Sequence, residues 1–210
     1  MIRLVIFDMD GVILDSEPLH NRAREILLKQ FGVNEPAEDM VGKSNKETWE
    51  PVIEKYGIPY TQPKIERMQH EIVMKILNDE NIQPTEGLME LINELEKRRI
   101  TMAVASSSAR WFVDHVLDYY KIKNKFFCTL TGNDVNNYKP HPEIYRKCLE
   151  ICGFSANETI AIEDSDSGQA SAVSANIKCI GYKNPGSGNQ KLERGFVTID
   201  RMIDVVKYID

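Results

Sequence analysis

Near its amino terminus the chain reads LVIFDMDGV at residues 4–12, an apolar run that ends abruptly in two acids and a glycine. A short apolar run with β-branched residues is typical of a buried strand. Residues two apart in an extended segment face the same side, so Asp8 and Asp10 can converge where the strand ends. Gly11 then allows a sharp turn. The stretch predicts a strand that carries two carboxylates to one edge of a sheet.

Two acids beside a turn also occur in solvated loops, and this pair alone does not separate the two interpretations. A calcium-binding loop is not favoured, because the later acidic positions of that motif do not follow. A second acidic pair, Glu163-Asp164, ends another predicted strand in AIEDS at residues 161–165. The alternative for this second pair is that it only caps a helix starting near Ser165.

Short β-branched runs alternate with helical patterns along the rest of the chain. The predicted strands cover residues 4–7, 100–105, 126–130, 159–162 and 177–180. Strands that alternate with helices indicate a parallel sheet with crossover helices. We therefore predict an α/β fold with a Rossmann-like parallel sheet core.

One long segment departs from this alternation. Three helical patterns, at about residues 17–31, 45–56 and 63–80, follow one another with no strand between them. An N-cap type residue at Ser16 and a proline at Pro84 mark the edges of this segment. We predict an all-helical cap domain at 15–84, inserted into a core made of 1–14 and 85–210. Such an insert would hang over the carboxyl end of the first strand, where open α/β sheets bind ligands.

If the two acidic strands are neighbours, Asp8, Asp10, Glu163 and Asp164 crowd into one small volume. Two unit charges about 4 Å apart repel by about 4 kcal/mol at an effective dielectric near 20. Several such pairs would destabilise the fold unless a cation lies among them. The ligands on offer are all oxygens, with no paired His or Cys, so a hard ion is expected and Mg²⁺ is the leading choice.

Two other polar residues are candidates for the site, one directly after the predicted strand at 100–105 and one in a loop. Ser106 precedes a helical pattern, and a hydroxyl beside a helix N-terminus forms a natural phosphate seat. The alternative is that Ser106, Ser107 and Ser108 only cap that helix. Lys139 lies in YKPHP at 138–142, where prolines stiffen the loop. A lone loop lysine is usually a solvated charge, so its interpretation depends on the acids around it.

The composition limits the classes of partner. The chain has 210 residues and a formal net charge of -6, which argues against a large nucleic-acid interface. No apolar run reaches membrane-spanning length, so we expect no membrane partner and a cytoplasmic location. The four cysteines include no CxxC motif, which fits reduced thiols. Cys148 and Cys152 could share a metal, but packing in the core is favoured because no histidine has matching spacing.

Taken together, the motifs resemble the haloacid dehalogenase superfamily of phosphatases. They occur in order as DMDGV at 8–12, Ser106 after a strand, Lys139 before a proline, and Glu163-Asp164. The segment DSEPLH at 15–20 and the position of the insert are similar to the β-phosphoglucomutase-like subgroup. The resemblance implies a magnesium-dependent phosphatase that hydrolyses a small phosphate monoester, such as a sugar phosphate, through a phospho-aspartate.

The same resemblance implies a role for each motif residue. Asp8 would be the nucleophile and Asp10 the general acid and base. The implied metal ligands are Asp8, the backbone carbonyl of Asp10, Asp164 and, in or next to the metal's shell, Glu163. The implied phosphate-binding residues are Ser106, Ser107 and Lys139.

A phosphosugar mutase of the β-phosphoglucomutase type is the alternative within this superfamily. Such mutases hold a second phosphate with basic cap residues, but Asn45 falls where an arginine is expected and Gln69 where a lysine is expected. Lys43 or Lys46 could substitute for them. His20 matches a cap-linker histidine of the mutases, but hydrolases share the same string, so it does not discriminate.

An alternative of another class is an aspartate-phosphorylated switch domain, because receiver domains also combine clustered acids, a hydroxyl and a lysine. Receivers take their phospho-acceptor and their other acids from different strands and have no helical cap. Here the second aspartate lies beside the implied nucleophile, where it can help to discharge it. The sequence therefore favours an enzyme over a switch, and it carries no pattern that predicts the oligomeric state.

Overall fold

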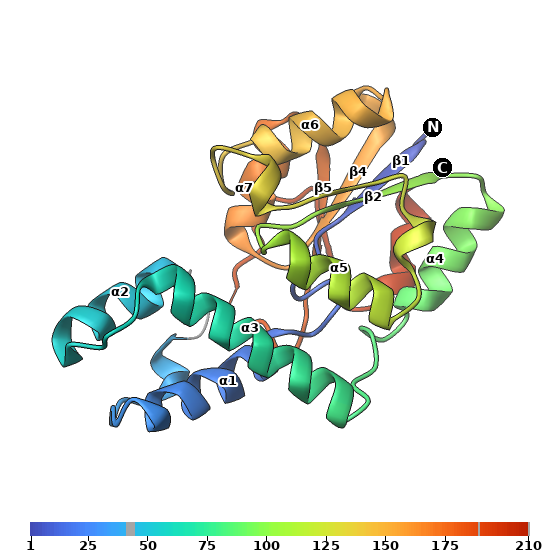
Figure 1. Cartoon of the computed structure of the whole chain (residues 1–210). Coiled ribbons are helices and arrows are strands. Elements are labelled where there is room, and N and C mark those ends of the chain that lie inside the picture. Colours follow the sequence, from blue (N-terminus) through green and yellow to red (C-terminus); the bar gives the residue numbers. More distant parts are fainter. Residues whose placement is uncertain (41–44, 189, 210) are drawn as a thin grey trace. The chain divides into compact units, whose positions relative to one another are not determined.

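The computed structural model describes residues 1–40, 45–188 and 190–209. They divide into two compact units (Figure 1). The core unit consists of Met1–Asp15 and Gln83–Asp210, and the helical unit consists of Ser16–Ile82. Each unit has its own hydrophobic core, and each is described here by itself.

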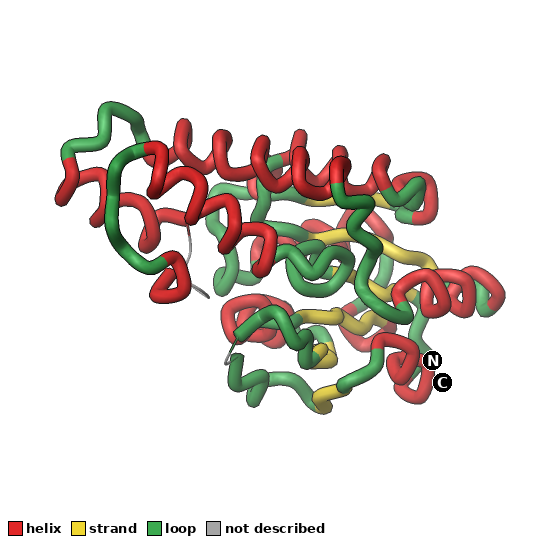
Figure 2. The backbone as a smooth tube through the Cα atoms, turned by 90° about the horizontal axis from the view of Figure 1, so that it is seen from below, coloured by secondary structure: helices red, strands yellow, loops and turns green. Residues whose placement is uncertain are grey.

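A six-stranded sheet lies at the centre of the core unit, in the order β3-β2-β1-β4-β5-β6, and every neighbouring pair is parallel. Figure 2 shows these strands running side by side. The strands are β1 (Leu4–Phe7), β2 (Thr101–Ala105), β3 (Cys128–Leu130), β4 (Thr159–Glu163), β5 (Lys178–Tyr182) and β6 (Val197–Ile199). The predicted α/β class with a parallel sheet and a helical insert is confirmed.

Helices cover both faces of this sheet, with α4 and α5 on one face and α6 and α7 on the other (Figure 1). Right-handed crossovers require this arrangement, because the chain moves from β1 to β3 in one direction and back through β4 to β5 in the other. All four residues of β1 are buried, which explains why its sequence is apolar throughout rather than alternating. The helices are α4 (Leu88–Lys97), α5 (Arg110–Tyr119), α6 (Glu143–Cys152) and α7 (Asp166–Ser174).

Two sheet edges differ from the sequence prediction. The strand expected at 126–130 begins only at Cys128, because Phe126 closes a 3-10 turn at Lys123–Lys125. The short edge strand β6 was not predicted, since it has only three residues after a long loop and only the last of them, Ile199, is buried. Short edge strands carry a weak sequence signal because one side lacks a paired neighbour.

The helical unit contains α1 (Glu17–Gln30), α2 (Asn45–Tyr56) and α3 (Gln62–Asp79), with a 3-10 turn at Ala37–Met40. Its core forms around Trp49, which is fully buried together with Leu27 and Ile65. The Trp49 Nε1–H donates to Gln69 Oε1 at 2.7 Å, so the buried indole nitrogen is satisfied. Across the described residues, no helix combines the length and hydropathy needed to span a membrane.

The stability of the helical unit can be probed through Leu27, whose side chain is fully buried on α1. We expect Leu27→Ala to lower the free energy of unfolding of this unit by about 2–5 kcal/mol, because it leaves a cavity in the core. The chain has two tryptophans, of which Trp49 lies in the helical unit. In a Trp111→Phe background, urea unfolding followed by Trp49 fluorescence measures this change.

The matched control is Ile26→Ala on the neighbouring position of α1, where the isoleucine is 47% exposed. Its expected effect is within about 0.5 kcal/mol, as for most surface substitutions. Equal losses in the two variants would contradict the assignment of Leu27 to the core.

Candidate active site

Three acids meet at the carboxyl end of the sheet. Asp8 follows the last residue of β1, Glu163 ends β4, and Asp164 comes next. Because β1 and β4 are parallel neighbours with Phe7 opposite Ile162, both acidic segments leave the sheet at the same level. One carboxylate oxygen from each acid lies within 4.8 Å of the others, and all three residues are buried. The two acidic pairs predicted from the sequence are therefore adjacent in space.

Lys139 provides the positive charge of this cluster. Its Nζ donates to Asp8 Oδ1 at 2.9 Å, to Glu163 Oε1 at 2.6 Å and to the Ala105 carbonyl at 2.8 Å. An ammonium has three N–H donors, so each of them has a protein acceptor. The side chain is only 5% exposed, which removes the interpretation of Lys139 as a solvated loop charge.

The charges in the cluster do not balance. Burial, followed by the charge of Glu163, raises the pKa of Asp8 well above its usual value, and Lys139 offsets only part of this. Burial also raises the pKa of Asp164 to about 7, while a hydrogen bond from Ser187 acts in the opposite direction. Burial lowers the pKa of Lys139, but Asp8 and Glu163 outweigh it and keep the ammonium charged. When all groups are ionised, three carboxylates face one ammonium, and one divalent cation would neutralise the remainder.

The donor set fits such a cation. The three acids of the cluster all offer carboxylate oxygens, which suit Mg²⁺ rather than a metal that prefers nitrogen or sulfur ligands. Glu163 Oε2 is buried and has no hydrogen-bond partner among the described residues. An unpaired buried carboxylate oxygen is costly, and a metal ion bound nearby would remove much of that cost.

Two neighbouring segments hold the acids in place. The Tyr145 hydroxyl, from α6, donates to Glu163 Oε1, and the Ser187 hydroxyl donates to Asp164 Oδ2. Gly11 has φ +73, and a Cβ added there would lie 1.8 Å from Asp164 Oδ2. The glycine is therefore required both by its backbone conformation and by the close approach of the acid.

Asp10 lies beside the three acids and is tied to the end of β2. The Ser108 hydroxyl donates to Asp10 Oδ2 at 2.6 Å, and the Ser108 backbone N–H donates to Ser106 Oγ at 3.0 Å. The charge of Asp10 contributes to the raised pKa of both Asp8 and Asp164. Ser106 is fully buried, so it lies in this polar cluster rather than on the surface.

The interpretation of these serines as helix caps is wrong. Helix α5 begins at Arg110, and its N-cap position is Ala109, which has no capping side chain. Asn133 Oδ1 accepts from the Arg110 N–H at 2.8 Å, so it satisfies one of the backbone donors at the start of this helix. Ser107 is exposed, and no contact within the described part of the chain connects its side chain with the acids.

The predicted cap residues lie in the helical unit. His20, on α1, has its Nδ1 at 2.9 Å from Gln69 Nε2, and Gln69 is almost fully buried. Asn45 is the first residue of α2. Lys43 lies outside the described residues. The structure thus gives His20 a defined partner within its own unit, while its contribution to the site stays a prediction.

Three contributors to the cluster escaped the sequence analysis: Ser108, Tyr145 and Ser187. The sequence analysis took Ser108 only as a helix cap, and Tyr145 lies in a helical segment without a chemical motif. Ser187 lies in a glycine-rich loop whose sequence shows no chemical motif. No local sequence pattern indicates their role, because each donates a hydrogen bond to an acid that is distant in the chain.

Comparison with known proteins places this geometry in context. The family model described as haloacid dehalogenase-like hydrolase matches residues 5–182. The phosphorylated carbohydrates phosphatase of Thermotoga maritima is 28% identical over 214 residues, covering 98% of each chain. The fructose-1-phosphate phosphatase YqaB of Escherichia coli is 26% identical over 179 residues, covering 84% of this chain and 94% of that protein.

Solved structures also share the fold. The crystal structure of β-phosphoglucomutase from Clostridium difficile superimposes with a TM-score of 0.79 at 24% identity, covering 100% of this chain and 96% of that one. At this level of identity the likeness concerns the arrangement of helices and strands. Both the sheet and the helical insert are therefore shared with an enzyme of known structure.

The charge balance of the cluster predicts the effect of removing Lys139. We expect Lys139→Met to lower the free energy of unfolding by about 3–5 kcal/mol at pH 8 in EDTA, because it leaves buried carboxylates without their counter-charge. The loss should be smaller at pH 5. There the raised pKa values of Asp8 and Asp164 mean that the folded protein holds protons on these acids, which removes the repulsion. Urea unfolding at both pH values measures the difference.

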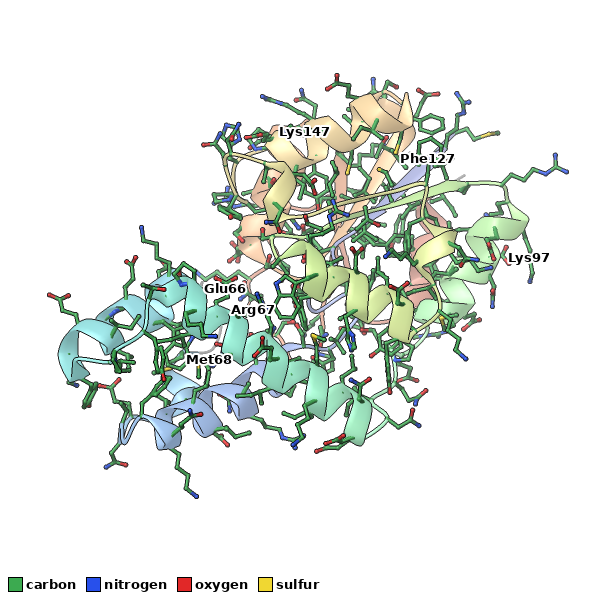
Figure 3. The ribbon with its side chains drawn as sticks, viewed as in Figure 1. Glu66, Arg67, Met68, Lys97, Phe127 and Lys147 are labelled. Atoms are coloured by element: carbon green, nitrogen blue, oxygen red, sulfur yellow. The ribbon has the colours of Figure 1, made fainter. Side chains whose placement is uncertain are left out.

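Lys147→Met is the matched control. Lys147 lies on α6 (Figure 3), and its side chain is 38% exposed beside Glu143. An exposed pair of this kind contributes at most about 1 kcal/mol, with little dependence on pH in this range. If Lys139→Met cost as little as this control at pH 8, the buried charge cluster would not be organised as described.

Proposed function

The chain belongs to the haloacid dehalogenase-like hydrolase family, and from that premise we propose that it is a magnesium-dependent phosphatase of small phosphate monoesters. The reaction would proceed through a phospho-aspartate at Asp8. The observation that carries the proposal is the cluster of Asp8, Glu163 and Asp164 around Lys139 at the carboxyl end of the sheet. The family expected from the sequence motifs is confirmed, and the reaction is our proposal.

In the first step, the Asp8 carboxylate attacks the phosphorus of the substrate as the bond to the leaving oxygen breaks. Asp10 donates a proton to that oxygen, so the product leaves as an alcohol. The Ser108 hydroxyl holds the Asp10 carboxyl in one orientation for this transfer. Lys139, 2.9 Å from Asp8 Oδ1, offsets the repulsion between the attacking carboxylate and the phosphate dianion.

In the second step, a water molecule attacks the phospho-aspartate. Asp10, now ionised, takes a proton from this water, and the bond between phosphorus and Asp8 breaks to release inorganic phosphate and the free carboxylate. Dividing the displacement in two helps because monoester hydrolysis is among the slowest uncatalysed reactions known. The adjacent Asp10 distinguishes this site from a switch, whose phospho-aspartate must persist.

The residues that would hold Mg²⁺ are Asp8, the backbone carbonyl of Asp10, and Asp164, with Glu163 in or next to the metal's shell. When bound, the ion supplies positive charge that stabilises the phosphoryl oxygens in the transition state. Tyr145 and Ser187 orient the acids that face it. Ser106 and Lys139 are the proposed donors to the transferring phosphoryl group, and Ser107 would assist through its place in the same turn.

We propose a phosphorylated carbohydrate as the substrate, because the similar phosphatases of Thermotoga maritima and Escherichia coli are named for such compounds. Hydrolysis is favoured over phosphate transfer between two positions of a sugar. Gln69, at the position where a mutase would place a lysine, is buried and bonded to Trp49 and His20, so it offers no cationic grip. The helical unit would select the substrate as a cap, with His20, Lys43 and Asn45 as candidate contacts, and the protein would work in the cytoplasm.

The proposed activity can be tested with a panel of phosphate monoesters that includes fructose 1-phosphate and β-glucose 1-phosphate. We expect steady release of inorganic phosphate with Mg²⁺ from at least one sugar phosphate. Asp8→Asn should lower this turnover by at least about 10⁴-fold, because the amide cannot act as the nucleophile. Circular dichroism should show an unchanged fold.

Asp118→Asn, at a side chain that is 63% exposed on α5, should retain full activity and serves as the control. Wild-type turnover by Asp8→Asn would remove Asp8 from its proposed role. Conversion of β-glucose 1-phosphate to glucose 6-phosphate without free phosphate would show a mutase, and a single stoichiometric phosphorylation would show a switch.

The metal site predicts a pH-dependent effect of Mg²⁺ on stability. We expect Mg²⁺ at about 100 times its dissociation constant to stabilise the protein by about 2.7 kcal/mol and to raise its melting temperature by several degrees. The apparent affinity should be lower at pH 6 than at pH 8, because Asp164, with a pKa of about 7, must lose its proton to bind the ion. Thermal unfolding in a Mg²⁺ titration at both pH values measures this.

Asp164→Asn should lose most of the Mg²⁺ response while Asp166→Asn, on the adjoining turn of α7, should keep it. An equal Mg²⁺-induced rise in melting temperature at pH 6 and pH 8 would contradict the proposed coordination. So would an unchanged rise in Asp164→Asn.

A further inference from the structure

Three of the four cysteines gather in the core unit where β3 meets α6. Cys128 begins β3, and Cys148 and Cys152 lie on α6. The sulfurs of Cys128 and Cys152 are 3.5 Å apart. Cys148 is fully buried in the core cluster, whereas Cys128 and Cys152 are partly exposed. The core-packing interpretation of the sequence holds for Cys148, and Cys152 packs against the same core cluster from a partly buried position beside the thiol of Cys128.

We propose that Cys128 and Cys152 form a modification site for hydroperoxides, which oxidise the two thiols to a reversible intramolecular disulfide. The proposed phosphatase reaction uses neither residue, so the two proposals are independent of each other. The position of the two sulfurs, their access to solvent and the third thiol beside them support this site.

The geometry favours a bond between these two sulfurs. A disulfide has a sulfur separation of about 2.05 Å, so the pair must close by about 1.5 Å, which small side-chain rotations can provide. Cys152 is the last residue of α6 and is followed by Gly153 in the left-handed conformation. Cys128 is the first residue of an edge strand. Cys152 therefore lies at the end of a helix and Cys128 at the start of a strand, and the neighbouring backbone can adjust at both positions.

Contacts among the neighbouring thiols give Cys128 and Cys152 different roles, one as the attacking thiol and the other as the resolving thiol. Cys148 and Cys152 can both donate S–H hydrogen bonds to the sulfur of Cys128, which lowers the pKa of Cys128. The same interaction with Cys128, together with burial, raises the pKa of Cys152. The thiolate is the reactive form of cysteine, and Cys152 is the last residue of α6, where the helix dipole disfavours a negative charge. Cys128 is therefore the attacking group and Cys152 is the resolving thiol.

The reaction with hydrogen peroxide is balanced. The Cys128 thiolate attacks one peroxide oxygen, a sulfur–oxygen bond forms as the oxygen–oxygen bond breaks, and the released hydroxide takes up a proton to become water. The Cys152 sulfur, losing its proton, then attacks the sulfenic sulfur of Cys128. A disulfide forms and the second oxygen leaves as water. The two thiols supply both electrons, and an external dithiol returns them.

The remaining cysteines should not react. Cys179 is 1% exposed on β5, and burial raises the pKa of its thiol well above the usual value. Cys148 is packed among core side chains that include Tyr145 and Leu130. In contrast, the residue before Cys128 is Phe127, which is 66% exposed and labelled in Figure 3, so β3 starts at the surface. Oxidation should therefore be selective for one pair.

The test is to treat the fully reduced, folded chain with one equivalent of hydrogen peroxide, block free thiols with an alkylating reagent and map the peptides by mass spectrometry. We expect one bridge, between Cys128 and Cys152, with Cys148 and Cys179 alkylated only after unfolding. Dithiothreitol should restore all four thiols. Cys152→Ser should stop at a sulfenic acid on Cys128, which dimedone traps.

Cys179→Ser is the matched control and should form the bridge at the wild-type rate. Cys128→Ser should consume hydrogen peroxide at least about tenfold more slowly than the wild-type chain. Melting temperatures of the reduced variants verify that each one folds. A bridge between Cys128 and Cys148, equal oxidation of all four thiols, or no oxidation of the folded wild-type chain would each overturn the proposal.

Discussion

The buried contact between the Lys139 ammonium and the carboxylates of Asp8 and Glu163 is the constraint on which the rest of the site depends. Burying several carboxylates together is unfavourable unless positive charge accompanies them. One ammonium reduces the imbalance, but three carboxylates face it, and burial together with the neighbouring acids raises the pKa of both Asp8 and Asp164. A divalent cation would neutralise the charge that Lys139 leaves unbalanced, and this requirement is the basis of the proposed chemistry.

The sheet order explains how these groups come together. Strand β1 lies between β2 and β4, so the segments that follow all three strands reach the same edge. Asp8 follows β1, Ser106 follows β2 and Asp164 follows β4. Lys139 is 131 residues from Asp8 in the chain, and its loop leads into α6, which also carries Tyr145. A single topological feature therefore positions the acids, their counter-charge and the residues that orient them.

The helical unit follows a different design. Three of its buried side chains form a hydrogen-bonded chain, in which Trp49 donates to Gln69 and Gln69 contacts His20. Hydrogen-bonded groups of this kind hold one side chain in one orientation at little cost, because every member finds a partner. The inserted unit thus has an internally ordered histidine, whereas the core unit has an internally ordered charge cluster.

Much of the organisation was readable in the sequence. The apolar run before Asp8, the acids that end β1 and β4, and the strand-free segment between Ser16 and Ile82 are local patterns, and local periodicity reports which elements form. The sequence also indicated that each acidic pair ends a strand of a parallel sheet, so the pairs would meet if their strands were neighbours. The sheet order shows that β1 and β4 are neighbours.

The tertiary structure decided which side chains meet. Ser108 lies beside Asp10, Ser187 beside Asp164, and Cys128 beside Cys152, although no motif links the members of any pair. Hydrogen bonds and sulfur contacts act over about 3–4 Å, whereas the crossovers that create these neighbours span many residues. Local sequence patterns therefore determine the elements and their chemical types, while individual contacts depend on how the whole chain folds back on itself.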